Sequence, residues 1–341
     1  MRGKILLGLV LAAVVALGLF LGPLSRRGVV LRVFCAGSLT LPLEEIKGEF
    51  ERQHQDVRVE IEPSGSVACV RKVVEVGKAA DVVAVADHRL IPTMMMPEHA
   101  DWYIVFATNQ MVLAYSNSSR HAGEVNSINW YEVLRDPEVR WGFSNPNIDP
   151  CGYRALMVIQ LAEWLYNDSS IFDDLIIENT AIKASEEGGR CSILVLKDLE
   201  PNSKRVTVRD KSVDLLSLLE EGGLDYAFEY LSVAVQHNLN YVVLPPAIDL
   251  SDLSRAEEYG RVVVTLASGE NIMGAPITYG VTIPKNAPNR DLAEEFIEFL
   301  IGDPGREVFS RLGQPSLSPA VASDLEALPP SLRPYCEEAS P

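Results

Sequence analysis

Apolar and polar residues alternate along the first third of the chain with two different periods. Residues 29–35, 57–61 and 81–86 are rich in β-branched apolar residues and have the length of strands. The segments between them carry apolar residues at helical spacing, as Leu43 and Phe50 do, with charged residues on the opposite face. Strands that alternate with amphipathic helices predict parallel βαβ units and an open α/β sheet.

A second block of the same kind follows. Residues 105–115 predict a strand that passes through a short polar stretch from the first block into the second. Helical patterns at 153–166 and 213–221 and a strand at 277–283 belong to this block, and an amphipathic helix at 291–300 follows it. Two α/β blocks joined by two crossing strands would enclose a cleft, and ligands of open α/β sheets bind outside the carboxyl ends of strands.

This pattern divides the chain into five parts. They are an N-terminal segment (1–28), the first part of lobe I (29–107), lobe II (108–283), helices that return to lobe I (284–328) and a loose, proline-rich tail (329–341). A chain of 341 residues has room for two domains of ordinary size.

The N-terminal segment differs in composition from the rest of the chain. An uncharged run at 5–24 is preceded by Arg2 and Lys4 and followed by two arginines. A basic stretch before an apolar one is typical of a secretory signal, but a run of this length can also span a bilayer as a helix. We therefore expect either a cleaved signal peptide or a retained membrane anchor, and in both cases an exported protein.

The formal net charge of −17 excludes some partners. Without the four basic residues of the N-terminal segment, the charge falls from −17 to −21. Such an acidic surface repels nucleic acid and no Lys/Arg cluster offsets it, so we expect no nucleic-acid partner. The same surface gives an anionic ligand no long-range attraction, so local dipoles must hold any anion.

The sequence carries no recognisable catalytic or metal-binding motif. Its five histidines and five cysteines show neither zinc spacing nor a triad pattern, and there is no phosphate-binding glycine loop. The odd number of cysteines leaves at least one unpaired, and the pairing of the others stays open. These features favour a binding protein over an enzyme, and we expect neither a cofactor nor a bound free metal cation.

Three segments that follow expected strands place small polar residues at the start of a helix. They are residues 36–40, 63–66 and 149–154. The free N–H groups and the dipole of a helix N-terminus favour an anion, glycine lets the backbone approach it, and serine adds an uncharged donor. One such segment is more often only a helix cap, but three of them at strand ends of one chain indicate an oxyanion site.

The motifs at these positions resemble those of the archaeal tungstate/molybdate-binding proteins of ABC transporters. The similar segments lie between about 33 and 320 and are 34–39, 80–84, 109–113, 149–154, 225–230 and 277–281. The resemblance implies a two-lobed α/β fold of the periplasmic-binding-protein type (type II), with the oxyanion in the cleft between the lobes. It also implies a location outside the cytoplasm, at the outer face of the cell membrane, with a permease and an ATPase as partners.

The resemblance further implies a set of oxyanion-binding residues. They are Gly37 and Ser38 in the first loop, Ser66 in the second, Asp149, Pro150 and Cys151 in the third, and Ser212 and Tyr230 beyond them. Gly37, Ser38, Ser66 and the hydroxyl of Tyr230 would act as donors, and Cys151 would supply a backbone N–H. A tyrosine on a short strand is about equally often a core residue, so both interpretations of Tyr230 stay open.

One position departs from the family pattern. The family has a glutamate where this chain has Ser212. Two carboxylates can raise the coordination of tungsten or molybdenum beyond four, and Asp149 would be one of these ligands. With Ser212 in place of the other, tetrahedral and expanded coordination both stay open. Asp214 and Glu229 could substitute only with a backbone shift, and we expect both to be solvated surface acids.

Two alternatives remain, and the choice between tungstate and molybdate also stays open. Phosphate or sulfate could be the ligand, because a carboxylate such as Asp149 accepts the proton of hydrogen phosphate. An enzyme could be built on the same two-lobed scaffold, with Lys211 as the candidate for proton transfer. Tungstate and molybdate are so alike in size and charge that the sequence favours neither.

Overall fold

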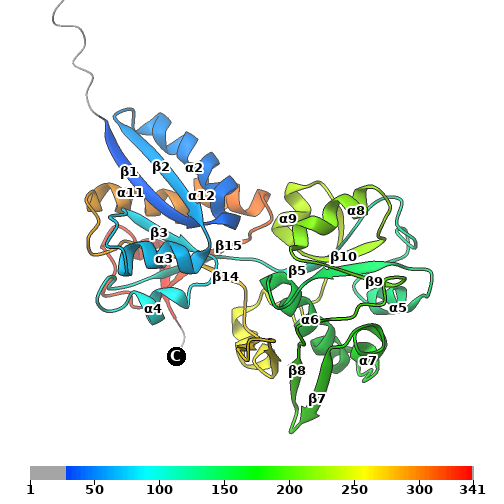
Figure 1. Cartoon of the computed structure of the whole chain (residues 1–341). Coiled ribbons are helices and arrows are strands. Elements are labelled where there is room, and N and C mark those ends of the chain that lie inside the picture. Colours follow the sequence, from blue (N-terminus) through cyan, green and yellow to red (C-terminus); the bar gives the residue numbers. More distant parts are fainter. Residues whose placement is uncertain (1–27, 340–341) are drawn as a thin grey trace, which may run out of the picture.

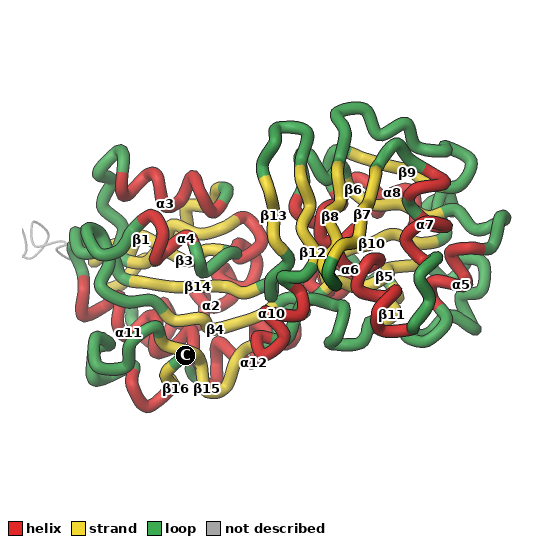
Figure 2. Tube along the Cα trace, turned by 90° about the horizontal axis from the view of Figure 1, so that it is seen from below, coloured by secondary structure: helices red, strands yellow, loops and turns green. Residues whose placement is uncertain are grey.

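The computed structural model describes residues 28–339, which form two lobes (Figure 1). Both ends of the described chain belong to the first lobe, and the middle of the chain forms the second, as Figures 1 and 2 show. The signal peptide or anchor expected at 1–28 lies, except for its last residue, outside the described residues. None of the helices within 28–339 has the length and apolar character needed to cross a membrane.

One sheet runs through the first lobe. In spatial order its strands are β16 (Cys336–Glu338), β15 (Ser316–Ala322), β4 (Ile104–Thr108), β14 (Thr278–Thr282), β3 (Val82–Val85), β1 (Val29–Ala36) and β2 (Val57–Ser64). Strand β1 pairs in parallel with β2 and β3, as the strand–helix alternation predicts, whereas β14 runs antiparallel to β3 and β4. The carboxyl ends of β1, β2 and β3 therefore lie at the same end of the sheet.

Helices cover both faces of this sheet. One face carries α2 (Thr40–Gln53), α11 (Arg290–Ile301) and α12 (Asp303–Arg311), and the other carries α3 (Ser66–Val74) and α4 (Leu90–Met94); the 3₁₀ turn η5 (Arg333–Tyr335) precedes β16. Successive side chains of β1 point to opposite faces, so Val33 packs in the cluster with α2 while Phe34 packs in the cluster with α3. Burial on both sides explains why β1 is almost entirely apolar.

The second lobe contains two sheets. The larger has the order β11 (Asn240–Val243), β5 (Met111–Tyr115), β10 (Tyr226–Tyr230), β6 (Trp141–Ser144) and β9 (Val206–Arg209), and the smaller has the order β13 (Asn271–Met273), β12 (Val262–Thr265), β8 (Arg190–Leu194) and β7 (Lys183–Glu187). The helices are α5 (Trp130–Arg135), α6 (Pro150–Tyr166), α7 (Ile171–Leu175), α8 (Leu216–Glu220), α9 (Leu231–Gln236) and α10 (Ala256–Tyr259), with 3₁₀ turns η2 (Ile177–Asn179), η3 (Ser212–Leu215) and η4 (Leu253–Arg255).

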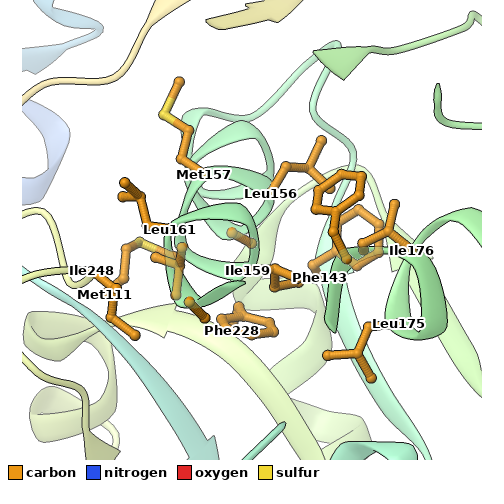
Figure 3. Close-up of a cluster of buried hydrophobic side chains, with 14 of the residues drawn as sticks. Met111, Phe143, Leu156, Met157, Ile159, Leu161, Leu175, Ile176, Phe228 and Ile248 are labelled. Atoms are coloured by element: carbon orange, nitrogen blue, oxygen red, sulfur yellow. The ribbon is translucent and has the colours of Figure 1, made fainter. Parts of the chain in front are cut away.

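Helix α6 forms the core of the second lobe. It packs against β6 and β10 of one sheet and β12 of the other, and its residues 155–163 are all buried. Figure 3 shows Leu156 of this helix and Phe228 of β10 within one apolar cluster. A helix that is apolar on every side is stable only when other elements surround it. Asp149 caps its N-terminus and thereby fixes where the helix begins.

Two crossings join the lobes. The first is at Asn109, between β4 and β5, and the second is 274–277, between β13 and β14. The crossings bond to each other, because the backbone N–H of Asn109 donates to the C=O of Ile277 at 2.9 Å. The side-chain amide of Asn109 also donates to Ser232 Oγ in the second lobe at 2.8 Å and to Tyr279 Oη in the first at 3.0 Å. This pair of segments is the place where the lobes can rotate against each other.

Three boundaries differ from those expected from the sequence. The strand at 277–283, assigned to lobe II, is β14, which is buried between β3 and β4 of the first lobe. The tail at 329–341 is not loose as far as it is described, because Leu332 is buried in the first lobe and β16 pairs with β15. The helix expected at 213–221 begins as a 3₁₀ turn at Ser212.

Gly152, in the first turn of α6, sets a close approach between the helix and the chain after β6. A Cβ at this position would lie 2.1 Å from the carbonyl oxygen of Ser144 and 2.8 Å from the nitrogen of Pro146. Both are backbone atoms, so Gly152→Ala must displace the start of α6. We expect a loss of about 2–3 kcal/mol in the free energy of unfolding, measured by urea denaturation.

Gly48→Ala is the matched control. Gly48 is exposed on α2, and an added Cβ there would meet no atom within 4 Å apart from the adjacent residues and backbone of its own helix. This change should gain up to about 1 kcal/mol from helix propensity. Equal stability of the Gly152→Ala variant and the wild type would contradict the close approach.

Candidate functional site

A cavity of about 820 Å³ lies between the lobes, beside the crossings. Ser38 and Ser66 line it from the first lobe, Asp149 and Tyr230 line it from the second, and Asn109 lines it at the hinge. Ser38 follows β1, Ser66 follows β2, Asp149 follows β6 and Tyr230 ends β10. The cavity is therefore built from segments at the carboxyl ends of strands in both lobes.

The structure brings the sequence-predicted site residues to one region. Those that line the cavity are Ser38, Ser66, Asp149, Pro150 and Tyr230. Gly37 is exposed next to Ser38 and does not line the cavity, and Cys151 and Ser212 are buried beside Asp149.

The loop after β1 forms the 3₁₀ turn η1 (Gly37–Leu39) and is tied to the hinge. The backbone C=O of Ser38 accepts a hydrogen bond from Gln314 Nε2 at 2.8 Å, and the same nitrogen donates to the hydroxyl of Tyr279 at 3.0 Å. The side-chain hydroxyl of Ser38 has no hydrogen-bond partner among residues 28–339. It is therefore available to donate to a ligand in the cavity.

Ser66 begins α3, with Gly65 as the N-cap residue. The hydroxyl oxygen of Ser66 accepts a hydrogen bond from the backbone N–H of Ala86 at 3.1 Å, so its own hydrogen remains free to donate. Val67 and Ala68 also line the cavity, and the N–H groups of this first turn have no acceptor within the helix. The first lobe thus offers several donors without a formal charge.

Both carboxylate oxygens of Asp149 accept hydrogen bonds from the backbone. Oδ1 accepts from the N–H of Cys151 at 3.2 Å, as the cap of α6, and Oδ2 accepts from the N–H of Ser212 at 2.7 Å. The N–H of Cys151, which the resemblance assigned to the ligand, is thus engaged by Asp149. The physical reason is that an aspartate before a helix satisfies the unpaired N–H groups of the first turn.

Tyr230 meets Arg154 of α6 in the wall of the cavity. Arg154 Nη1 donates to the hydroxyl oxygen of Tyr230 at 2.6 Å, and the guanidinium carbon lies 5.5 Å from the centre of the Tyr230 ring. Sequence reasoning placed Arg154 in the 149–154 motif but gave it no role. The signal was its spacing: Pro150 and Arg154 are four residues apart on a helix and share one face, and both line the cavity.

The loop between β3 and α4 brings a charge pair to the opposite wall of the cavity. Arg89 donates to the two carboxylate oxygens of Asp87 at 2.9 and 2.8 Å. Burial raises the pKa of Asp87, but the hydrogen bonds and the positive charge of Arg89 together outweigh it and keep the pKa below its ordinary value. The charge of Arg154 acts in the same direction, which places it within electrostatic reach of this loop.

Glu229 is fully buried behind the site, which corrects the expectation of a solvated surface acid. Its Oε2 accepts a long hydrogen bond from the N–H of Tyr230 at 3.3 Å, and its Oε1 has no partner within the described chain. Burial raises the pKa of Glu229 to about 8, the hydroxyl of Ser212 opposes this, and the charge of Asp149 adds to it. At pH 7 a largely neutral carboxylic acid therefore lies behind Asp149.

Among the described residues, side chains that could bind a metal ion or transfer a proton do not gather at the cavity. No three His, Cys, Asp or Glu side chains within residues 28–339 are placed to hold a metal ion, and all five cysteines are free thiols. Lys211, the sequence candidate for proton transfer, is exposed and does not line the cavity. The cavity itself offers hydrogen-bond donors around a space for a small solute.

Two α/β lobes joined by two segments, with donors from both lobes around one cavity, are the architecture of a protein that binds a small solute between its lobes. Residues 31–313 match the family model of the bacterial extracellular solute-binding proteins, and the chain belongs to that family.

Relatives and solved structures agree with this assignment. A solute-binding protein of Methanoculleus marisnigri is 52% identical over 295 residues, which cover 86% of this chain and 83% of that protein. The molybdate/tungstate-binding protein WtpA of Pyrococcus abyssi is 44% identical over 331 residues, covering 93% of this chain and 95% of that protein. The solved substrate-binding domain of an ABC transporter from Clostridium difficile has a TM-score of 0.58 at 18% identity and covers 85% of this chain and 100% of that domain. The predicted type II periplasmic-binding-protein fold is confirmed.

The raised pKa of Glu229 predicts a pH dependence of stability. The folded protein holds the proton up to about pH 8, whereas the unfolded chain releases it near its ordinary pKa of about 4.3. Stability therefore falls as pH rises between these values. We expect Glu229→Gln to lose less stability than the wild type between pH 5 and 8, by a few kcal/mol, in urea denaturation curves.

Two features make this comparison specific. Burial also raises the pKa of Asp249, to about 6, but this contribution is common to both proteins and cancels in the difference. Glu220→Gln, on the exposed surface of α8, should follow the wild type at every pH. Parallel curves for Glu229→Gln and the wild type would show that Glu229 is ionised in the folded protein.

Proposed function

We propose that this protein is the extracytoplasmic solute-binding component of an ABC transporter and that it captures tungstate or molybdate. The observation that carries the proposal is the set of uncharged donors on opposite walls of one cavity. Ser38 and Ser66 each keep a hydroxyl hydrogen for a ligand, and Tyr230 accepts from Arg154 and so keeps its own. A tetrahedral dianion that carries no proton needs donors alone.

The similarity to the archaeal molybdate/tungstate-binding protein supports this ligand class. That relative is 44% identical to this chain across nearly the full length of both proteins. In the proposed role the protein works at the outer face of the cell membrane, where it delivers the anion to a permease that an ATPase drives. The proposed role is transport and not catalysis.

The contacts of Asp149 favour ordinary tetrahedral coordination over an expanded shell. Each carboxylate oxygen of Asp149 already accepts a backbone N–H, and Ser212 stands where the family has a second carboxylate. Each oxygen keeps a second lone pair, but the two backbone contacts fix the direction in which that lone pair can face a metal. We therefore assign Asp149 the role of organising the cavity wall.

The ligand class can be tested by calorimetry and thermal denaturation of the exported domain. We expect tungstate and molybdate to bind and to stabilise the folded protein, by about 2.7 kcal/mol at a ligand concentration 100 times Kd. Phosphate, which carries a proton at neutral pH, should bind far more weakly, and sulfate, which carries none, is the control that tests selection among proton-free anions of the same shape. Stabilisation by phosphate or sulfate without any effect of tungstate or molybdate would identify the ligand as one of the other oxyanions.

The donors from the first lobe give a second prediction. Ser38→Ala and Ser66→Ala should each weaken the binding of the oxyanion by about 1–3 kcal/mol, because each removes a hydrogen bond to a charged ligand. Ser66→Ala should also cost the free protein about 1 kcal/mol, since the N–H of Ala86 loses its acceptor. Ser38→Ala should leave the free protein unchanged.

Ser217→Ala is the matched control for these variants. Ser217 is exposed on α8 and lies outside the cavity. Isothermal titration with tungstate compares the variants, and denaturation of the free proteins separates binding from folding. Unchanged affinity in both Ser38→Ala and Ser66→Ala would mean that these loops do not hold the ligand.

A further inference from the structure

The cavity contains one cationic side chain without a carboxylate partner. Three arginines line it: Arg71, Arg89 and Arg154. Arg89 is paired with Asp87 at 2.8 Å, and Arg71 is paired with Glu75 at 3.2 Å. Arg154 forms no ion pair with any residue of the described chain, although it is partly buried. A charge removed from water in this way favours an anion beside it.

The hydrogen bond between Arg154 and Tyr230 restricts what the tyrosine hydroxyl can do. A guanidinium has donors only, so the Tyr230 oxygen must accept in the 2.6 Å contact. The hydroxyl hydrogen cannot point back at Arg154, and no acceptor within residues 28–339 receives it. Because Tyr230 lines the cavity, its hydrogen is left for whatever the cavity holds.

We propose that Arg154 is a positioning residue that commits the Tyr230 hydroxyl to donate a hydrogen bond to the bound oxyanion, and that its charge offsets the charge of the ligand. This inference rests on the proposed function and goes beyond it. A donor adjacent to a cation is stronger than a neutral one. It also favours ligands whose oxygens all lack a proton, because the P–OH oxygen of hydrogen phosphate is a weaker acceptor than a charged oxygen and its hydrogen finds no acceptor in this hydroxyl.

The two carboxylates near Arg154, those of Asp87 and Asp149, are engaged by other groups and leave its charge uncompensated. Asp87 is engaged by Arg89, and both carboxylate oxygens of Asp149 accept backbone N–H groups. Neither carboxylate forms an ion pair with Arg154. The guanidinium also lies over two aromatic rings, at 5.5 Å from Tyr230 and 5.7 Å from Tyr153, which hold it in place without neutralising it.

A double-mutant cycle tests the proposal. Calorimetric titration with tungstate compares the wild type, Arg154→Met, Tyr230→Phe and the double variant. We expect Arg154→Met to weaken binding about 10–100-fold and Tyr230→Phe about 10-fold. The double variant should lose clearly less than the product of the two single losses, because without Arg154 the hydroxyl is a weaker donor and is free to turn to water. Losses that multiply in the double variant would overturn the proposal.

Two further variants separate a positioning role from a structural one. Arg154→Lys keeps a charge and a donor, so it should recover most of the affinity that Arg154→Met loses. Arg71→Met removes a cation from the same cavity, but one that is already paired, and it should change affinity less than about threefold. If Arg154→Met fails to fold, the cycle is built with Arg154→Gln and Tyr230→Phe, because a glutamine carries no charge and its amide can accept as well as donate, so it no longer commits the tyrosine hydroxyl.

Titration of the wild type distinguishes failure of the proposed function from failure of the role proposed for Arg154. Wild-type protein that binds neither tungstate nor molybdate refutes the proposed function, and the inference with it. Wild-type protein that binds tungstate, with folded Arg154→Met equal to it in affinity, refutes the role of Arg154 alone.

Discussion

The carboxylate of Asp149 is the contact on which the second lobe's half of the cavity depends. It caps α6 through the N–H of Cys151 and, with its other oxygen, holds η3 through the N–H of Ser212. Since α6 is buried on every side, the position of its first turn is set by this cap and by the close packing of Gly152. Arg154 follows one turn later on the same helix, so the geometry of the cap fixes where the guanidinium meets the cavity.

A chain of hydrogen bonds links the first lobe's donors to the hinge. Gln314 binds the carbonyl of Ser38 and the hydroxyl of Tyr279, and Asn109 binds the same hydroxyl and Ser232 of the second lobe. The loop that carries Ser38 and the segments that join the lobes are therefore parts of one polar network. A change at the crossings can therefore reach this donor through buried side chains, although Gln314 Oε1 itself has no hydrogen-bond partner within residues 28–339.

The sequence predicted those features of the fold and site that are local. The spacing of the apolar residues predicts the alternation of β1, α2, β2, α3 and β3. The loops with Ser38 and Ser66 could be identified because each follows a strand and precedes a helix. The lobe of β14 was misassigned, since its own pattern is the same for either sheet and only its partners decide. Glu229 and the role of Arg154 were missed for a related reason. Arg154 and Tyr230 are 76 residues apart, and no local pattern marks the contact.

Charge explains why an acidic protein can hold an anion. With a net charge of −17 the surface repels a dianion at long range, but exposed charges are screened over about 8–10 Å at ordinary ionic strength. Within the cavity the balance is different. Asp87 is neutralised by Arg89, Asp149 is surrounded by backbone donors, and Glu229 keeps its proton through burial. These three carboxylates are thus compensated one by one, whereas Glu270, which is exposed and also lines the cavity, has no ion-pair partner within residues 28–339. Of the three arginines that line the cavity, Arg154 is the one without a carboxylate partner in the described chain. A site arranged in this way attracts an anion through short-range hydrogen bonds and not through the long-range potential of the surface. Its selectivity depends on how well the oxygens of the ligand accept hydrogen bonds.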